Sequence, residues 1–308
     1  MMQPPAYPPH PGYAPYPAYP PKLVPLEAIF SRAWTLLRAN WTIALVPIAA
    51  GAVCLLALIP YLAGIFTFMA QTLRHPDVAP AFPTWVFGYF ALAYLVVIVV
   101  ALCSITMIFG MADAAWARGS ATFADGFAAV RSCTGAMFVA GIGFIGLGIA
   151  AVILALPTLF VSFLALLVFT MYVLPAVVSG GRGGFEAISE SFRLVRRSFG
   201  RSAIGIFMLI ALQYALSFVM YPVMLPVMIP FQTALINAKP GDPSAILTAL
   251  PSVPVLVVCA AALGILSLLS YAYYAYYALT LTGMYRSVAF PEDPALAVAT
   301  PAGEATAG

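Results

Sequence analysis

Five long stretches of this chain contain no charged residue, and they restrict its possible folds more than any other feature does. A helix needs about 20 apolar residues to cross the hydrocarbon of a bilayer, so every stretch is long enough for at least one crossing. A water-soluble fold would have to bury all five of them. The stretches are 39–73, 78–112, 132–181, 202–238 and 243–285.

The composition supports the same conclusion. Of the 308 residues, 63% are hydrophobic and only 7% are charged, whereas a soluble domain carries about 25% charged residues. So few charges cannot cover a water-facing surface, and the lipid bilayer is therefore the expected partner of most of the chain. No run rich in lysine or arginine indicates a nucleic-acid partner. We predict an all-α, polytopic membrane helical bundle.

Four of the charge-free stretches fit one membrane span each, and the longest, 132–181, fits two. The expected turn between those two is at Pro157, because proline cannot continue a helix and restrains the residue before it. The prediction is thus six transmembrane helices. Their expected bounds are 42–68, 84–112, 134–155, 158–179, 203–231 and 252–284.

The distribution of basic residues predicts the orientation. With the N-terminus in the cytoplasm, eleven of the 13 lysines and arginines fall inside, and only Arg74 and Lys239 fall outside, as the positive-inside rule requires. A single span over 134–179 would place the arginines after it outside. We therefore expect an inner-membrane protein with both termini cytoplasmic. The transmembrane domain would cover 23–289, between a disordered Pro/Tyr-rich tail at 1–22 and a disordered tail at 290–308.

Two segments that precede pairs of spans resemble each other. Residues 26–38 and 185–197 each contain Glu-Ala-Ile and place arginines opposite apolar residues at helical spacing, and 123–131 is a shorter, weaker version. Such helices lie in the membrane interface and turn their basic residues toward anionic headgroups. We predict an interfacial helix followed by a helical hairpin, repeated three times. The candidate contacts to anionic lipids are Arg193, Arg196 and Arg197.

A few polar residues lie at membrane depth. Asp113 interrupts an apolar stretch, which suggests either a function or a structural pairing with an arginine near the interface. The last span carries five tyrosines within 271–277, which either line a polar pocket or seal a contact between helices. The candidate pocket residues are Asp113, Gln213, Tyr273, Tyr274 and Tyr277.

The fifth span contains prolines at a spacing of four residues, Pro222, Pro226 and Pro230. Each proline removes a backbone N–H from the helix and frees a carbonyl one turn earlier. Broken helices of this kind line substrate sites in some transporters, but prolines also simply bend helices. Both interpretations are open from the sequence.

The ordinary residues of catalysis are nearly absent. The two histidines, His10 and His75, are too few for a metal site, which needs three or four protein ligands. The four cysteines lack the paired spacing of a zinc or redox motif. We therefore expect no enzyme activity and no cofactor. The first hypothesis is a non-enzymatic protein that acts through contacts with lipid or with a membrane or cytoplasmic protein. The second is a transporter or channel for a small or amphipathic solute.

The three-hairpin layout, the stretch 184–194 and the closing Met284-Tyr285-Arg286 resemble a group of bacterial six-span membrane proteins. That group is similar to the membrane domain attached to some glycerophosphodiester phosphodiesterases. The resemblance covers about residues 23–289 and implies a six-helix membrane fold. The catalytic domain of those enzymes has no counterpart in this sequence, so the resemblance implies no catalytic residue.

Overall fold

The computed structural model describes residues 24–74, 84–155, 157–158, 161–237 and 253–292. Within these segments every regular element is helical and there is no strand, which confirms the all-α prediction. The elements are α1 Leu26–Ala39, the 3-10 turn η1 Trp41–Ala44, α2 Leu45–Arg74, α3 Trp85–Arg118, α4 Phe123–Ala155, α5 Val161–Thr170, α6 Val173–Val178, α7 Gly184–Arg197, α8 Phe199–Asn237 and α10 Val253–Ala289.

Six helical stretches are long and apolar enough to cross a membrane, which confirms the predicted number of spans. The fourth combines the short helices α5 and α6, and Pro157 lies in the turn between α4 and α5, as predicted. The predicted tail at 1–22 lies outside the described residues, as do 75–83 of the predicted loop at 69–83, 238–251 of the predicted loop at 232–251, and 293–308 of the predicted tail at 290–308. The stretches are Trp41–Ile65, Trp85–Arg118, Phe123–Ala155, Val161–Val178, Phe199–Pro226 and Ala261–Ala289.

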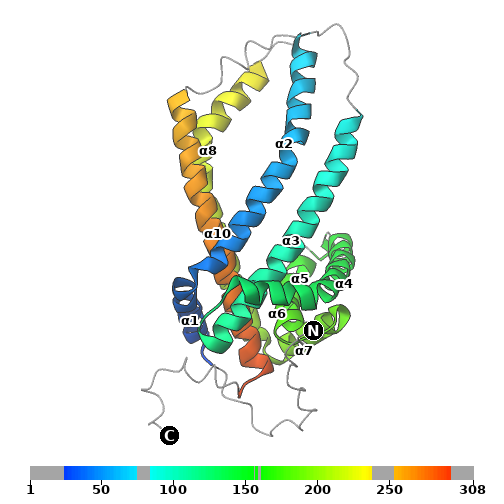
Figure 1. Cartoon of the computed structure of the whole chain (residues 1–308), viewed down its shortest axis with the longest axis vertical. Coiled ribbons are helices and arrows are strands. Elements are labelled where there is room, and N and C mark those ends of the chain that lie inside the picture. Colours follow the sequence, from blue (N-terminus) through cyan, green and yellow to red (C-terminus); the bar gives the residue numbers. More distant parts are fainter. Residues whose placement is uncertain (1–23, 75–83, 156, 159–160, 238–252, 293–308) are drawn as a thin grey trace.

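The helices are packed together at one end only. In Figure 1, α2 and α3 lie side by side, as do α8 and α10, and the two pairs diverge toward the top. At the bottom gather α1, α6, α7 and the adjoining ends of α3 and α10, and here lie the largest fully buried side chains, among them Trp116, Tyr172 and Tyr285. The diverging parts carry exposed large hydrophobic residues, the surface that lipid covers.

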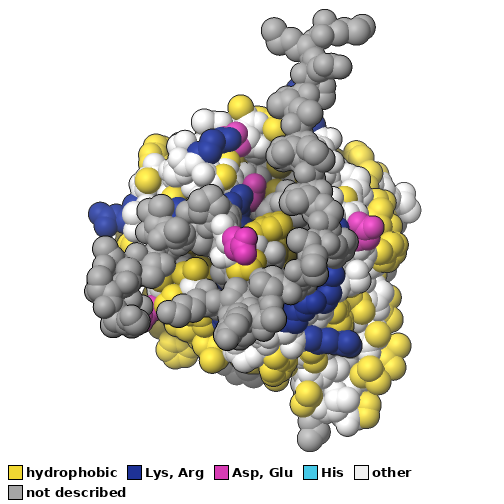
Figure 2. All heavy atoms as spheres, turned by 90° about the horizontal axis from the view of Figure 1, so that it is seen from below, with side chains coloured by type: hydrophobic (Ala, Val, Ile, Leu, Met, Phe, Trp, Pro, Cys, Tyr) yellow, Lys and Arg dark blue, Asp and Glu magenta, His cyan; other side chains and the backbone are white. Residues whose placement is uncertain are grey.

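The packed end is also the charged end. We use this name for the region of α1, the α3–α4 turn, α6, α7 and the last turns of α10. Figure 2 looks onto this end and shows its basic and acidic side chains. Among the arginines of the described segments, only Arg74, at the far end of α2, lies at the opposite end. Several helices continue past their predicted limits here: α3 runs to Arg118, and α8 begins at Phe199.

Helices α1 and α7, the two segments predicted to lie in the membrane interface, repeat each other closely. Their buried residues follow the same spacing, so the two helices can be aligned by their buried faces. In that alignment the Glu-Ala-Ile triplets of the two helices are offset by one residue. The structural repeat therefore follows the buried face rather than the triplet. The corresponding residues are Ile29 and Ala187, Ala33 and Ser191, Leu36 and Leu194, and Leu37 and Val195.

The same register explains where these helices end. Asn40 and Ser198 occupy equivalent positions and share one backbone conformation, with φ −126° and ψ 48° at Asn40 and φ −131° and ψ 38° at Ser198. Each side chain donates a hydrogen bond to a carbonyl four residues earlier, which competes with the helical pattern. The chain turns at these residues into the next span.

The middle segment, 123–131, differs from the prediction. It is helical, but it forms the first part of α4 rather than a separate interfacial helix. In the register of the buried residues, Met137 stands where Asn40 and Ser198 stand in the other units. Its thioether does not donate a hydrogen bond to the backbone, and α4 continues through it without a break.

Each segment that was predicted to be interfacial packs against the second span of the preceding hairpin, and α1, which begins the chain of helices, packs against the second span of the last one. The start of α4 lies on α3, α7 lies on α5 and α6, and α1 lies on α10. The second spans also share a buried motif of a small residue, methionine and one further residue. The second spans of all three hairpins therefore contribute to one core, and we call each hairpin together with the segment that precedes it a unit. The motifs are Gly110-Met111-Ala112, Thr170-Met171-Tyr172 and Gly283-Met284-Tyr285.

Candidate functional site

Helix α7 presents three different faces around its axis, because successive residues are turned by about 100°. One face, with Ala187 and Leu194, is buried against the core. A second, with Glu186 and Glu190, is charged. The third carries Phe185, Ile188 and Phe192 and ends in Arg196.

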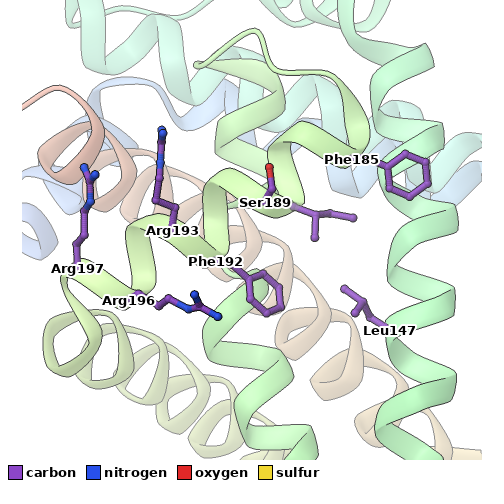
Figure 3. A pocket seen from close by; sticks show the side chains of 8 residues that line it. Leu147, Phe185, Ser189, Phe192, Arg193, Arg196 and Arg197 are labelled. Atoms are coloured by element: carbon purple, nitrogen blue, oxygen red, sulfur yellow. The ribbon is translucent and has the colours of Figure 1, made fainter. Parts of the chain in front are cut away.

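The third face of α7 borders an open groove against α4, with a volume of about 640 Å³. Helix α7 lies close to α4 here, and a Cβ added at Gly143 would displace the end of the Ile188 side chain. The floor of the groove is apolar and its rim is basic (Figure 3). The lining residues are Leu147, Phe185, Ile188, Ser189, Phe192, Arg193, Arg196 and Arg197.

The three arginines predicted to contact anionic lipid all line this groove, but they are not equivalent. Arg196 is exposed and lies beside the Phe192 ring, whereas the side chains of Arg193 and Arg197 point away from that ring (Figure 3). Arg193 also forms an ion pair with Glu190. The guanidinium that stands next to the apolar floor is therefore that of Arg196.

This arrangement suits a molecule that is charged at one end and apolar along its body. A guanidinium donates several hydrogen bonds to phosphate oxygens, and the phenylalanine and leucine side chains offer contact to an acyl chain. On the charged face of α7, a separate polar hollow of about 340 Å³ mixes both signs of charge. Its lining consists of Arg182, Glu186, Ser189, Glu190 and Arg193.

Four of the five predicted pocket residues lie together. A hollow of about 340 Å³ between α5, α8 and α10 is lined by Gln213 and by the tyrosines 273, 274 and 277, along with Tyr214 and two aliphatic residues. The Tyr273 hydroxyl donates to the Leu209 carbonyl at 2.8 Å, so this tyrosine ties α10 to α8. The Gln213 Oε1 atom is buried and has no hydrogen-bond partner among the described residues.

Asp113, the fifth predicted residue, lies apart from that hollow and pairs with Arg286. The Arg286 Nε and one terminal nitrogen donate to the same Asp113 oxygen at 3.0 and 2.8 Å. Of the two interpretations of Asp113 given by the sequence, this contact is the structural pairing with an arginine. Asp113 and Arg286 directly follow the buried methionine motifs of the first and third units. Val173 is the residue that follows the motif in the second unit.

Several polar residues that organise this region give no sequence signal. The Ser191 hydroxyl donates to the Phe169 carbonyl at 2.7 Å and accepts from the Tyr172 N–H at 3.1 Å. It thus supplies hydrogen-bond partners to backbone groups at the break between α5 and α6. The Tyr172 hydroxyl in turn contacts the Ser202 hydroxyl at 3.0 Å. A serine within a helix is common, and only the break in span four reveals what Ser191 does.

The fifth span is one continuous helix that contains its three prolines. Figure 1 shows α8 bending away from α10 in its proline-bearing part. The prolines thus accompany a bend rather than a break in the helix. The described residues contain no group of three or more histidine, cysteine, aspartate or glutamate side chains that could hold a metal ion.

Comparisons with protein-family models, with curated proteins and with solved structures find no match to this chain.

Proposed function

We propose that this chain is a non-enzymatic inner-membrane protein that binds anionic phospholipid through the groove between α7 and α4. The observation that carries the proposal is the position of Arg196, exposed beside Phe192 at the rim of an apolar groove. A lipid phosphate would accept hydrogen bonds from the guanidinium, and the acyl chain would lie along Phe185 and Leu147.

The proposal places the charged end of the molecule in the cytoplasmic leaflet, with both termini in the cytoplasm. It is supported by the location of every described arginine except Arg74 at that end, because cytoplasmic segments carry the excess of basic residues. The anionic lipids of that leaflet attract such residues by about 1 kcal/mol for each one near the surface. The resemblance to the membrane domain of phosphodiesterases, and contact with a further protein, remain predictions.

The test compares lipid selectivity in proteoliposomes of the full chain. The relative association of spin-labelled phosphatidylglycerol and spin-labelled phosphatidylcholine is measured by electron paramagnetic resonance. Arg196→Gln is expected to weaken phosphatidylglycerol binding in this groove about fivefold, the equivalent of about 1 kcal/mol, and so to lower the measured preference of the protein. Added salt is expected to weaken the preference in the wild type. Arg74→Gln removes the same charge at the other end and should leave the preference unchanged. Equal preference in Arg196→Gln and the wild type would refute the proposal.

A transporter for a small or amphipathic solute is the second candidate function. The observation that favours it is the buried, unpartnered Gln213 Oε1 atom beside the tyrosine-lined hollow, because a buried acceptor without a donor is costly unless a ligand supplies one. A ligand for this hollow would be largely apolar and carry a hydroxyl or amine donor. Solute flux in proteoliposomes is the measurement that would establish it.

A further inference from the structure

The groove face of α7 has counterparts in the other two units. In the register set by the buried residues, one row of positions four apart runs along the same side of each interfacial segment. In all three units this row contains an aromatic residue followed, one turn later, by an arginine. The pairs are Trp34 and Arg38 in α1, Phe127 and Arg131 in α4, and Phe192 and Arg196 in α7; the pair in α4 lies one turn earlier than the others.

These side chains are open to the surroundings. Trp34 is 54% exposed and Phe127 is 58% exposed, although both stand next to buried core residues on their own helices. Arg38 and Arg131 are exposed as well. Exposed aromatic rings next to basic residues are typical of the membrane–water interface, where the ring lies at the level of the headgroups.

Among the described residues, no acidic side chain neutralises the charges of these arginines. No described acidic side chain forms an ion pair with Arg38, Arg131 or Arg196. By contrast, nearby Arg118 pairs with Asp125 at 2.8 Å, and Arg193 pairs with Glu190. Arg118 and Arg193 are not members of the three aromatic–arginine pairs. The arginines that are members have a positive charge available for an external anion.

We infer that the chain binds three anionic phospholipids, one on each unit, and that Trp34 with Arg38 and Phe127 with Arg131 form the two further headgroup sites. The inference rests on the function proposed above and extends it from one site to three. Phospholipid is the occupant that fits, because each site combines a guanidinium that pairs with no described carboxylate with an aromatic ring, exposed at Trp34 and Phe127 and half-buried at Phe192, on a helix beside apolar spans. A free phosphate ion would use the charge alone.

The experiment counts the phosphatidylglycerol molecules that the full-length protein retains, by native mass spectrometry after release from mixed micelles of phosphatidylglycerol and phosphatidylcholine. The variants are Arg38→Gln, Arg131→Gln, Arg196→Gln and the triple variant, with Arg118→Gln as the control because Asp125 already neutralises that charge. Each single variant is expected to retain one lipid fewer than the wild type, and the triple variant none. Arg118→Gln should match the wild type.

Different outcomes separate this inference from the proposed function. If Arg196→Gln loses one lipid while Arg38→Gln and Arg131→Gln lose none, the α7 site stands and the two further sites are refuted. If Arg196→Gln also loses none, the proposed function itself fails. Lysine variants keep the charge and should keep the lipid, so a lipid lost in Arg38→Lys or Arg131→Lys as well would indicate damage to the fold and refute that site. Displacement of the lipid by inorganic phosphate would show a simple anion site instead.

Discussion

Buried side-chain amides and hydroxyls decide where the helices at the charged end turn. The Asn40 amide donates to the carbonyls of Leu36 and Gly119 at 3.0 and 3.1 Å, and its oxygen accepts from the Ala121 N–H at 2.7 Å. Gly119 ends α3 in the left-handed conformation, with φ 78°, where glycine carries no steric penalty. One side chain thus joins the α1–α2 corner to the α3–α4 turn.

Asn40→Ala is expected to lower the free energy of unfolding by about 1–3 kcal/mol, because it leaves a buried donor and acceptor without partners. Reversible unfolding in mixed detergent micelles measures the change. Thr35→Ala is the control, since the Thr35 hydroxyl is exposed and bonds only within its own helix; this variant should change stability by less than about 0.5 kcal/mol. If Asn40→Ala were as stable as that control, the joining role of Asn40 would be wrong.

At the scale of elements, the sequence predicted much of the fold because hydrophobic length and charge placement act locally. The charge-free stretches and Pro157 predicted six spans, and helical periodicity predicted α1 and α7. The continuity of α4 through Met137 and the break of span four at Met171–Tyr172 were not predicted. The first depends on whether the side chain at one position can bond to the backbone of its own helix, and the second depends on Ser191 of α7. Hydrophobic spacing along one helix carries neither piece of information.

The contact of α7 with α4 depends on Gly184. A Cβ there would lie 2.6 Å from the Ala136 carbonyl oxygen and 2.6 Å from the Ala140 nitrogen, both of them backbone atoms that cannot move aside. Gly184→Ala is therefore expected to lower the free energy of unfolding by about 1–3 kcal/mol through overpacking. Differential scanning fluorimetry in detergent would show the loss as a lower melting temperature.

Gly146 provides the matched control for that substitution. It lies in α4, the helix against which Gly184 packs, but a Cβ added there meets nothing within 4 Å, and alanine favours a helix over glycine by about 1 kcal/mol. Gly146→Ala should therefore be neutral or stabilising. If both alanine variants shifted the melting temperature alike, the close contact at Gly184 would not be what holds α7 in place.

At the scale of the whole molecule, the three hairpins share one core at the charged end, and α1, the start of α4 and α7 pack around it. The sequence brought Arg193, Arg196 and Arg197 together on one helix, and it grouped Gln213 with the tyrosines of the last span. It did not indicate which arginine faces the apolar groove, because that depends on where α4 passes. It also did not reveal that Asp113 and Arg286 follow equivalent motifs, since their partnership arises only when the units close into a cycle.

The most direct test of this architecture asks on which side of the membrane the three interfacial segments lie. Single cysteines replace the exposed residues Ser31, Ala128 and Ser189, one on each segment, in a chain whose four native cysteines are changed to alanine. Cells expressing each variant are treated with a membrane-impermeant maleimide, with a cysteine at Thr84, before α3, as the external control. All three interfacial positions should be labelled only after the membrane is permeabilised, while the control is labelled in intact cells. Labelling of any one interfacial position in intact cells would contradict the three-unit arrangement.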